Sequence, residues 1–451
     1  MNRKPLFPAA VAALLALRLA AAPAHDPASA NLTVGVLSDV HVGTSRATTL
    51  EKAFTFFRDA GVDGVIIAGD IANGGNSNEL KSAGNAWDAV FPGNRAPDGR
   101  PVEKIFLYGN HDYFGKSISR DPAAAWRYAF GEDWAPVYAK TVKGYVFICA
   151  HWGHEKRLAD FLAANEEKLH LRGNRPFFYS QHPHPGDTVY GPWAWGNDKG
   201  VATQALCTYS NAVAFSGHSH HSLTDERSVW QGAFTSIGTS SLSYIYAQYW
   251  RENGESTGGE PVKQMPLLRE SDGKQGMVMR VYDDAIVLER WDLIAQQKLG
   301  PDWTIPLDGS RPFAFETRRA AAIPPEFAPD TPVLLSTGKG KNRGGKEVEQ
   351  LTVTFPSALP STTSRVLDYE VQALAYHEDK DYPVATKRVH SAAFFLPVER
   401  DAPTNRCVFA LSELPSDKPL RFAVRPVECY GKKGHEILSD WWSMPKPAPA
   451  P

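Results

Sequence analysis

Short clusters of His, Asp and Asn follow predicted strands at five places in the first half of the chain. The strands are short β-rich or buried-type runs at residues 32–37, 65–68, 104–108, 177–180 and 212–215. The clusters are, in order, Asp39-Val40-His41, Gly69-Asp70, Gly109-Asn110-His111-Asp112, His182 and Gly217-His218-Ser219-His220. Because ligands of an open α/β sheet bind beyond the carboxyl ends of its strands, these side chains are expected to converge on one sheet edge.

The segments between these strands have helical spacing. Leu50, Ala53, Phe54 and Phe57 recur on one helical face before Gly61, and a second helical stretch is predicted around residues 155–169. Residues 276–282 and 285–291 form a predicted closing hairpin around Asp283-Asp284. The alternation predicts an α/β core with helices on the sheet faces.

The donor types indicate a metal site. A mixed set of imidazole, carboxylate and amide donors suits divalent Mn, Fe, Zn or Co. The alternative is a set of ordinary turns, since Gly, Asn and Asp favour turns. That alternative accounts for the glycines but not for the histidines that accompany them.

The ordered motifs D-x-H, G-D, G-N-H-D, a lone His and G-H-x-H resemble the calcineurin-like metallophosphoesterase family. The resemblance runs from Asp39 to His220. It implies a two-sheet β-sandwich flanked by helices, and hydrolysis of phosphate mono- or diesters by a hydroxide bound to two divalent metal ions. It also implies the ligands: Asp39, His41 and His220 for the first metal, Asn110, His182 and His218 for the second, and Asp70 bridging both.

By the same resemblance, His111 is a catalytic residue and not a ligand. It follows Asn110 and would protonate the leaving oxygen or stabilise the transition state. Asp112 is expected to orient His111, and its alternative is a solvated turn residue. Nearby, the loop at residues 188–197 carries Tyr190, Trp193 and Trp195, which could stack on a substrate or pack locally as a lid.

The catalytic domain is predicted to span residues 31–322. Four prolines in residues 323–332 mark a stiff linker. Seven strand candidates between residues 333 and 445, one of them at 393–396, predict a small all-β sandwich. Its segment 420–431 resembles the sixth strand of a fibronectin type III domain, and residues 446–451 form a tail. Cys407 and Cys429 could form a disulfide there or remain buried thiols.

The N-terminus has the layout of a secretory signal peptide. Arg3 and Lys4 precede an apolar stretch over residues 6–22, which ends in Ala22-Pro23-Ala24. Residues 1–24 are therefore excluded from the fold, and a second cleavage pattern would extend the peptide to residue 30. Arg18 interrupts the apolar stretch, which leaves it short of the ~20 residues that a membrane-spanning helix needs. The mature protein is expected to be secreted or periplasmic, without a membrane anchor.

Composition limits the partners. A chain of 451 residues predicts two or three domains, its net charge of −2 carries no nucleic-acid signature, and its four cysteines cannot form a disulfide scaffold. A small phosphoester is the expected partner, and the sequence does not indicate an oligomeric state. The alternative is an inactive phosphoesterase fold that serves as a binding or adhesion protein. The intact set of seven ligands favours the enzyme.

Overall fold

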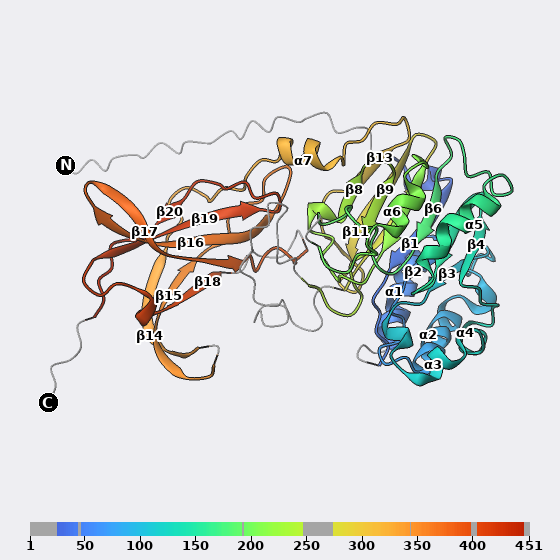
Figure 1. Ribbon diagram of the computed structural model, residues 1–451, viewed down its shortest axis with the longest axis horizontal. Helices are drawn as coiled ribbons and strands as arrows, with labels where there is room; N and C mark the ends of the chain where they lie inside the picture. Colours follow the sequence, from blue (N-terminus) through green and yellow to red (C-terminus); the bar gives the residue numbers. More distant parts are fainter. Residues whose placement is uncertain are drawn as a thin grey trace, which may run out of the picture.

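The computed structural model describes residues 25–43, 47–191, 194–246, 274–342, 344–397 and 404–445. The predicted signal peptide, the tail and Trp193 lie outside them. An α/β part is followed by an all-β part, and the two are joined through α7 (Phe315–Ala321) (Figure 1). Among the described residues, no helix is both long enough and apolar enough to cross a membrane.

Two sheets form the centre of the α/β part. The first has the order β12-β11-β10-β1-β2-β3, with β13 also paired to β11, and β1, β2 and β3 run parallel. Its strands are β1 (Leu32–Leu37), β2 (Gly64–Ala68), β3 (Glu103–Leu107), β10 (Gln275–Val281), β11 (Ala285–Asp292), β12 (Gln297–Lys298) and β13 (Trp303–Pro306). The second sheet has the order β4-β5-β6-β7-β9-β8. Its strands are β4 (Val137–Val142), β5 (Tyr145–Ala150), β6 (Phe177–Ser180), β7 (Ala212–Ser216), β8 (Val229–Gln231) and β9 (Thr235–Gly238).

Three apolar cores hold this part together as four layers. Alternate side chains of β1, such as Val34 and Val36, face the second sheet and pack with Phe147, Phe178 and Phe215. The outer face of the first sheet is covered by α1 (Ala47–Asp59), α2 (Ser77–Val90) and α4 (Pro122–Phe130), with α3 (Lys116–Arg120) beside them. The outer face of the second sheet is covered by α5 (Leu158–Asn165) and α6 (Val201–Leu206).

The five strands that precede the polar clusters are confirmed, as are the α1 face and the closing hairpin. The expectation of a single sheet edge needs correction. The first three clusters follow β1, β2 and β3 of one sheet, whereas His182 and His218 follow β6 and β7 of the other. The clusters meet because the two sheets pack face to face with their carboxyl ends on the same side.

The all-β part contains seven strands within the described residues. One sheet has the order β14-β15-β18 and the other β17-β16-β19-β20. The strands are β14 (Leu334–Lys341), β15 (Glu347–Phe355), β16 (Val366–His377), β17 (Lys380–His390), β18 (Asn405–Ala410), β19 (Leu420–Glu428) and β20 (Ile437–Leu438). Leu351, Tyr369 and Phe422 lie in the core between the two sheets.

Two predictions in this part are wrong. Residues 393–396 form turns, because Phe394 and Phe395 pack into a small apolar cluster with Ile245 of the α/β part. The sequence analysis did not predict β17, an edge strand whose charges and Pro383 conceal its pattern. The predicted disulfide is also absent: Cys407 and Cys429 are both free thiols and belong to different apolar clusters.

Candidate metal centre

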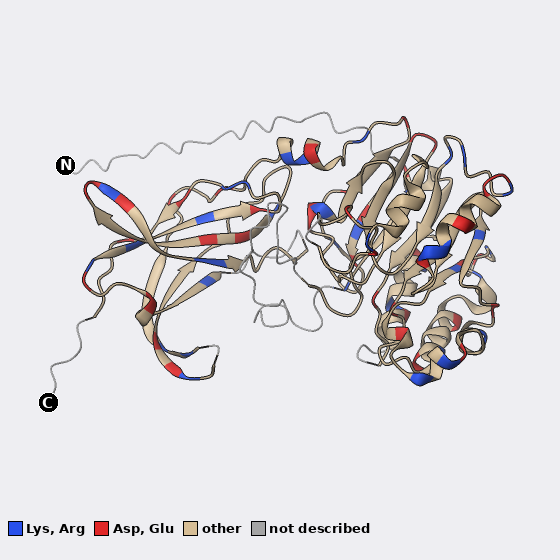
Figure 2. Cartoon of the chain, viewed as in Figure 1, with Lys and Arg blue, Asp and Glu red and all other residues tan. Residues whose placement is uncertain are grey.

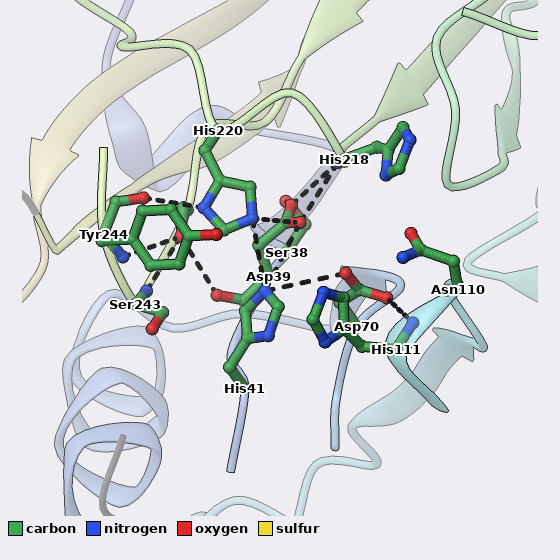
Figure 3. Close-up of polar contacts among 12 residues, drawn as sticks. Ser38, Asp39, His41, Asp70, Asn110, His111, His218, His220, Ser243 and Tyr244 are labelled. Carbon is green, nitrogen blue, oxygen red and sulfur yellow. Dashed lines mark hydrogen bonds and ion pairs between the residues drawn. The ribbon is translucent and has the colours of Figure 1, made fainter. Parts of the chain in front are cut away.

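Seven side chains converge between the two sheets. Asp39 and His41 follow β1, Asp70 follows β2, Asn110 follows β3, His182 follows β6, and His218 and His220 follow β7. Two groups have donor atoms within 4.8 Å of one another and could each hold a metal ion. The first group is Asp39, His41, Asp70 and His220, and the second is Asp70, His182 and His218. Figure 3 shows these side chains facing one another.

Asp70 is the carboxylate that both groups share. Its Oδ2 lies 3.6 Å from His41 Nε2 and 3.2 Å from His182 Nε2. The amide oxygen of Asn110 lies 3.1 Å from the same His182 nitrogen, which places Asn110 with the second group. Asp39 Oδ1 lies 3.0 Å from His220 Nε2 in the first group.

The histidine tautomers make this site a good match for cations. His220 Nδ1 faces the Tyr244 carbonyl and His182 Nδ1 faces the Ala68 carbonyl, each at 2.8 Å, so both Nδ1 atoms carry the proton of the neutral ring. His41 Nδ1 likewise faces the Asn73 side-chain oxygen at 3.2 Å. The Nε2 lone pairs therefore point inward, and those of His41 and His220 lie 3.2 Å apart with no proton between them. A divalent cation would satisfy these converging lone pairs, and the carbonyl bonds behind the rings are the usual support of metal-binding histidines.

The electrostatics of the pocket agree with this match. Burial, together with His220, lowers the pKa of His41 to about 4, and burial together with His182 lowers that of His218 to about 3. Burial opposes the charged form of His182 too, but the carboxylates of Asp70 and Asp39 outweigh it and raise its pKa to about 9. Burial also opposes the ionised form of Asp39, yet His220 and His182 hold its pKa well below the usual range. The two carboxylates are thus anionic in a pocket that favours positive charge.

Local backbone geometry aims the donors inward. Five of the seven residues have left-handed backbones, with φ of 51° to 69°: Asp39, His41, Asp70, His218 and His220. Such angles are unfavourable for side chains with a Cβ and persist where surrounding structure imposes them, often at functional sites. The motif glycines supply space. A Cβ on Gly109 would lie 2.2 Å from Asp70 Oδ1, and one on Gly217 would lie 2.4 Å from Asp39 Oδ2.

His111 lies at the edge of this centre. Its ring is 4.5 Å from that of His41, and its backbone N–H donates to Asp70 Oδ1 at 2.8 Å. His111 Nδ1 faces the Asn73 carbonyl at 2.8 Å, which leaves Nε2 as the ring nitrogen available to a substrate. His111 belongs to neither donor group.

Asp112 has a different place from the one expected. Its buried carboxylate accepts hydrogen bonds from the backbone N–H groups of Ile71 and Ala72 at 3.2 and 2.7 Å, and from that of Gly109 at 2.7 Å. The Asn73 carbonyl, and not Asp112, orients the His111 ring. Asp112 is neither a solvated turn residue nor the partner of His111: it ties the loop after β2 to the loop after β3, and so sets the spacing of Asp70 and Asn110.

Three further residues support the centre without having been predicted. Ser38 Oγ donates to Asp39 Oδ2 at 2.5 Å, and Asn73 contacts both His41 and His111. The Tyr244 ring lies 4.1 Å from that of His220 and 5.9 Å from that of His41. Ser38 and Asn73 adjoin the D-x-H and G-D motifs, which was a usable signal. Tyr244 lies in no motif, so the sequence gave no signal for it.

Aromatic side chains border the centre. Trp152 and Trp195 lie 5.3 and 5.0 Å from the His218 ring, and Phe114 lies 4.2 Å from the His111 ring. Trp195 is 47% exposed and Phe114 65% exposed, whereas Tyr190 is buried. Of the predicted aromatic loop, Tyr190 therefore packs locally, and Trp195 remains accessible next to a candidate ligand.

Comparison with known proteins agrees with this geometry. Residues 32–222 match the family described as Calcineurin-like phosphoesterase. One similar structure is a conserved uncharacterized protein of Streptococcus pneumoniae TIGR4, a predicted phosphoesterase, with 14% identity over 61% of this chain and 97% of that one, and a TM-score of 0.29. Another is purple acid phosphatase PPD1 from yellow lupin (Lupinus luteus) seeds, with 13% identity, 61% and 53% coverage and a TM-score of 0.38, so this chain spans about half of its length. No curated protein matches. The α/β part thus has a mixed α/β metallophosphoesterase fold, followed by antiparallel all-β sheets.

Proposed function

We propose that this chain is an exported, metal-dependent phosphoesterase that hydrolyses phosphate mono- or diesters. The observation that carries the proposal is the pair of buried donor groups that share Asp70 within the segment matching the phosphoesterase family. Two divalent ions, when bound there, would supply Lewis-acid activation of the phosphoryl group and of water. Asp39, His41 and His220 would hold one ion, Asn110, His182 and His218 the other, and Asp70 both.

The remaining residues would position the reaction. With Nδ1 engaged by the Asn73 carbonyl, His111 Nε2 is the atom that would give a proton to the leaving oxygen or stabilise charge on it. Asp112 would act indirectly, because its hydrogen bonds fix the two loops that carry Asp70 and Asn110. Trp195 and Phe114 would flank the ester group of the substrate.

Export and the C-terminal module are part of the proposal. Arg3, Lys4 and the apolar stretch before Ala24 support a signal peptide, and N-terminal sequencing of the exported protein would locate its cleavage site. The two antiparallel sheets, of three and four strands, support a fibronectin-III-like module. Charges of both signs are intermixed over both parts (Figure 2), in keeping with a small-molecule substrate and no nucleic-acid partner.

The test is activity after metal removal and return. Stripped protein is given Mn, Fe, Zn or Co in turn and assayed with p-nitrophenyl phosphate, bis-p-nitrophenyl phosphate and a panel of other phosphoesters. We expect about two bound metals per chain and turnover that depends on them. Stoichiometric metal without turnover on any ester would favour the binding or adhesion protein instead.

A further inference from the structure

A second cavity lies between the two parts of the chain. It has a volume of about 570 Å³, and its walls come from β11, β13 and α7 on one side and from residues 358–366 and 391–397 on the other. This volume is typical of small-molecule sites, which often occur at domain interfaces. None of the seven candidate metal ligands lines it.

Positive charge dominates the cavity. Glu226 accepts hydrogen bonds from Arg290 at 2.9 Å, from Trp303 Nε1 at 3.0 Å and from Arg318. One carboxylate thus faces two guanidinium groups. The other acidic residue in the wall, Asp302, is bound by Lys298 at 2.6 Å. Elsewhere on the chain Lys and Arg are interspersed with Asp and Glu (Figure 2).

Arg365 adds a third guanidinium without an acidic partner in the part of the chain that the structure describes. Nη1 donates to the carbonyls of Phe394 and Leu396, at 3.2 and 2.5 Å, and Nη2 donates to that of Leu299. A guanidinium has five N–H groups, so two remain for another acceptor. Carbonyl groups supply no compensating charge, and a largely buried cation without a counter-ion is costly. In agreement, burial and the neighbouring Arg290 lower the pKa of Arg365 to about 10.

The wall next to Arg365 contains another unused polar group. Ser364 is 6% exposed, and its hydroxyl has no hydrogen-bond partner among the described residues. Much of the remaining lining is apolar or aromatic and includes Trp303, Phe313 and Phe394. Buried polar groups are normally satisfied, so the unpaired hydroxyl and the uncompensated guanidinium indicate a missing partner.

We propose that this cavity binds a small organic anion, with an apolar body against the aromatic wall and a carboxylate or phosphate group at Arg365 and Ser364. The site is separate from the metal centre and does not depend on the proposed hydrolysis. Because Arg365 donates to carbonyls of both parts of the chain, an anion bound to it would rest on the junction between them.

The experiment uses two probes that differ in charge alone. Binding of 4-phenylbutyrate and of 4-phenylbutan-1-ol to the full-length protein is measured by calorimetry, at low and high salt. We expect the carboxylate to bind at least tenfold more tightly than the alcohol, with an affinity that falls as salt rises. Arg365→Met should weaken binding of the carboxylate by about 10- to 100-fold and leave the alcohol nearly unchanged.

Two variants serve as controls. Arg406→Met removes an exposed arginine of β18 outside the cavity and should change neither affinity. Ala393→Phe fills the cavity without touching an arginine and should abolish binding of both probes, which keeps the test decisive if Arg365→Met unfolds. Equal affinity for the two probes, no binding of either, or carboxylate binding unaffected by Arg365→Met or Ala393→Phe in folded protein would each overturn the proposal.

Discussion

At the scale of single residues, Asp70 has the most demanding position in the candidate centre. It is the carboxylate shared by the two donor groups, and it also accepts the His111 backbone N–H. We expect Asp70→Ala to abolish turnover and to lower metal content more than any other single ligand change. Metal analysis alongside activity checks this, with His41→Ala as the comparison, since His41 belongs to one group. Two retained metals with near-normal turnover would contradict the assignment.

His111 is expected to affect chemistry without affecting metal content, because it lies beside the donor groups and outside them. His111→Ala should keep both metals and lose about 10²–10⁴-fold in turnover if the ring acts as a general acid. The loss should shrink for esters with good leaving groups, which need little protonation. An equal loss on good and poor leaving groups would indicate electrostatic stabilisation, and loss of metal would make His111 a ligand.

Trp195 is expected to contribute to substrate preference, because it is 47% exposed beside His218. Trp195→Ala should lower the preference for 2-phenylethyl over ethyl phosphate esters by about fivefold, the size of one aromatic contact. The two alcohols are similar leaving groups, so the ratio of their kcat/KM values isolates the ring contact. Tyr128→Ala is the matched control: Tyr128 is 55% exposed on α4 and should leave the ratio unchanged. An unchanged ratio in Trp195→Ala would show that this tryptophan does not contact the ester group.

At the scale of elements, the close approach of α2 and α4 supports the loops that carry Asp70 and Asn110. A Cβ on Gly84 in α2 would lie 2.1 Å from the Ala129 carbonyl oxygen in α4. Gly84→Ala should therefore destabilise the α/β part by about 2 kcal/mol, since the clash exceeds the ~1 kcal/mol that alanine gains in a helix. Denaturant unfolding checks this. Gly338→Ala is the control, because nothing lies within 4 Å of its Cβ position, and a variant Gly84→Ala as stable as this control would contradict the packing.

At the scale of the whole molecule, the centre joins the two sheets of the α/β part and leaves the all-β part untouched. Removing tightly bound metal should lower the Tm of the α/β transition by about 10 °C, because ions that bind only the folded state stabilise it. The all-β transition should not move. Scanning calorimetry with and without a chelator measures both. In Asp70→Ala, metal should have little effect on either transition, and a chelator shift of equal size in that variant would place the stabilising ion elsewhere.

The sequence alone determined the strands that deliver the donors and the order of the motifs, because buried strands and Gly-containing polar turns are local patterns. It also indicated the two-part organisation. It did not identify β17, because an edge strand tolerates the charges and the proline that obscure its alternation. It also mistook residues 393–396 for a strand, because an apolar run has the same pattern whether it pairs in a sheet or packs against Ile245.

Contacts between distant segments were decided only by the tertiary structure. Asp112 bonds backbone groups some forty residues earlier, and Asn73 orients His111 through a carbonyl that has no side-chain signature. Tyr244 reaches the donors only because the loop after β9 folds back over His220. The cavity around Arg365 exists only where the two parts meet, and its charge is the sum of side chains from both. Local patterns fix which residues begin and end an element, whereas the packing of one sheet on another decides which of their side chains meet.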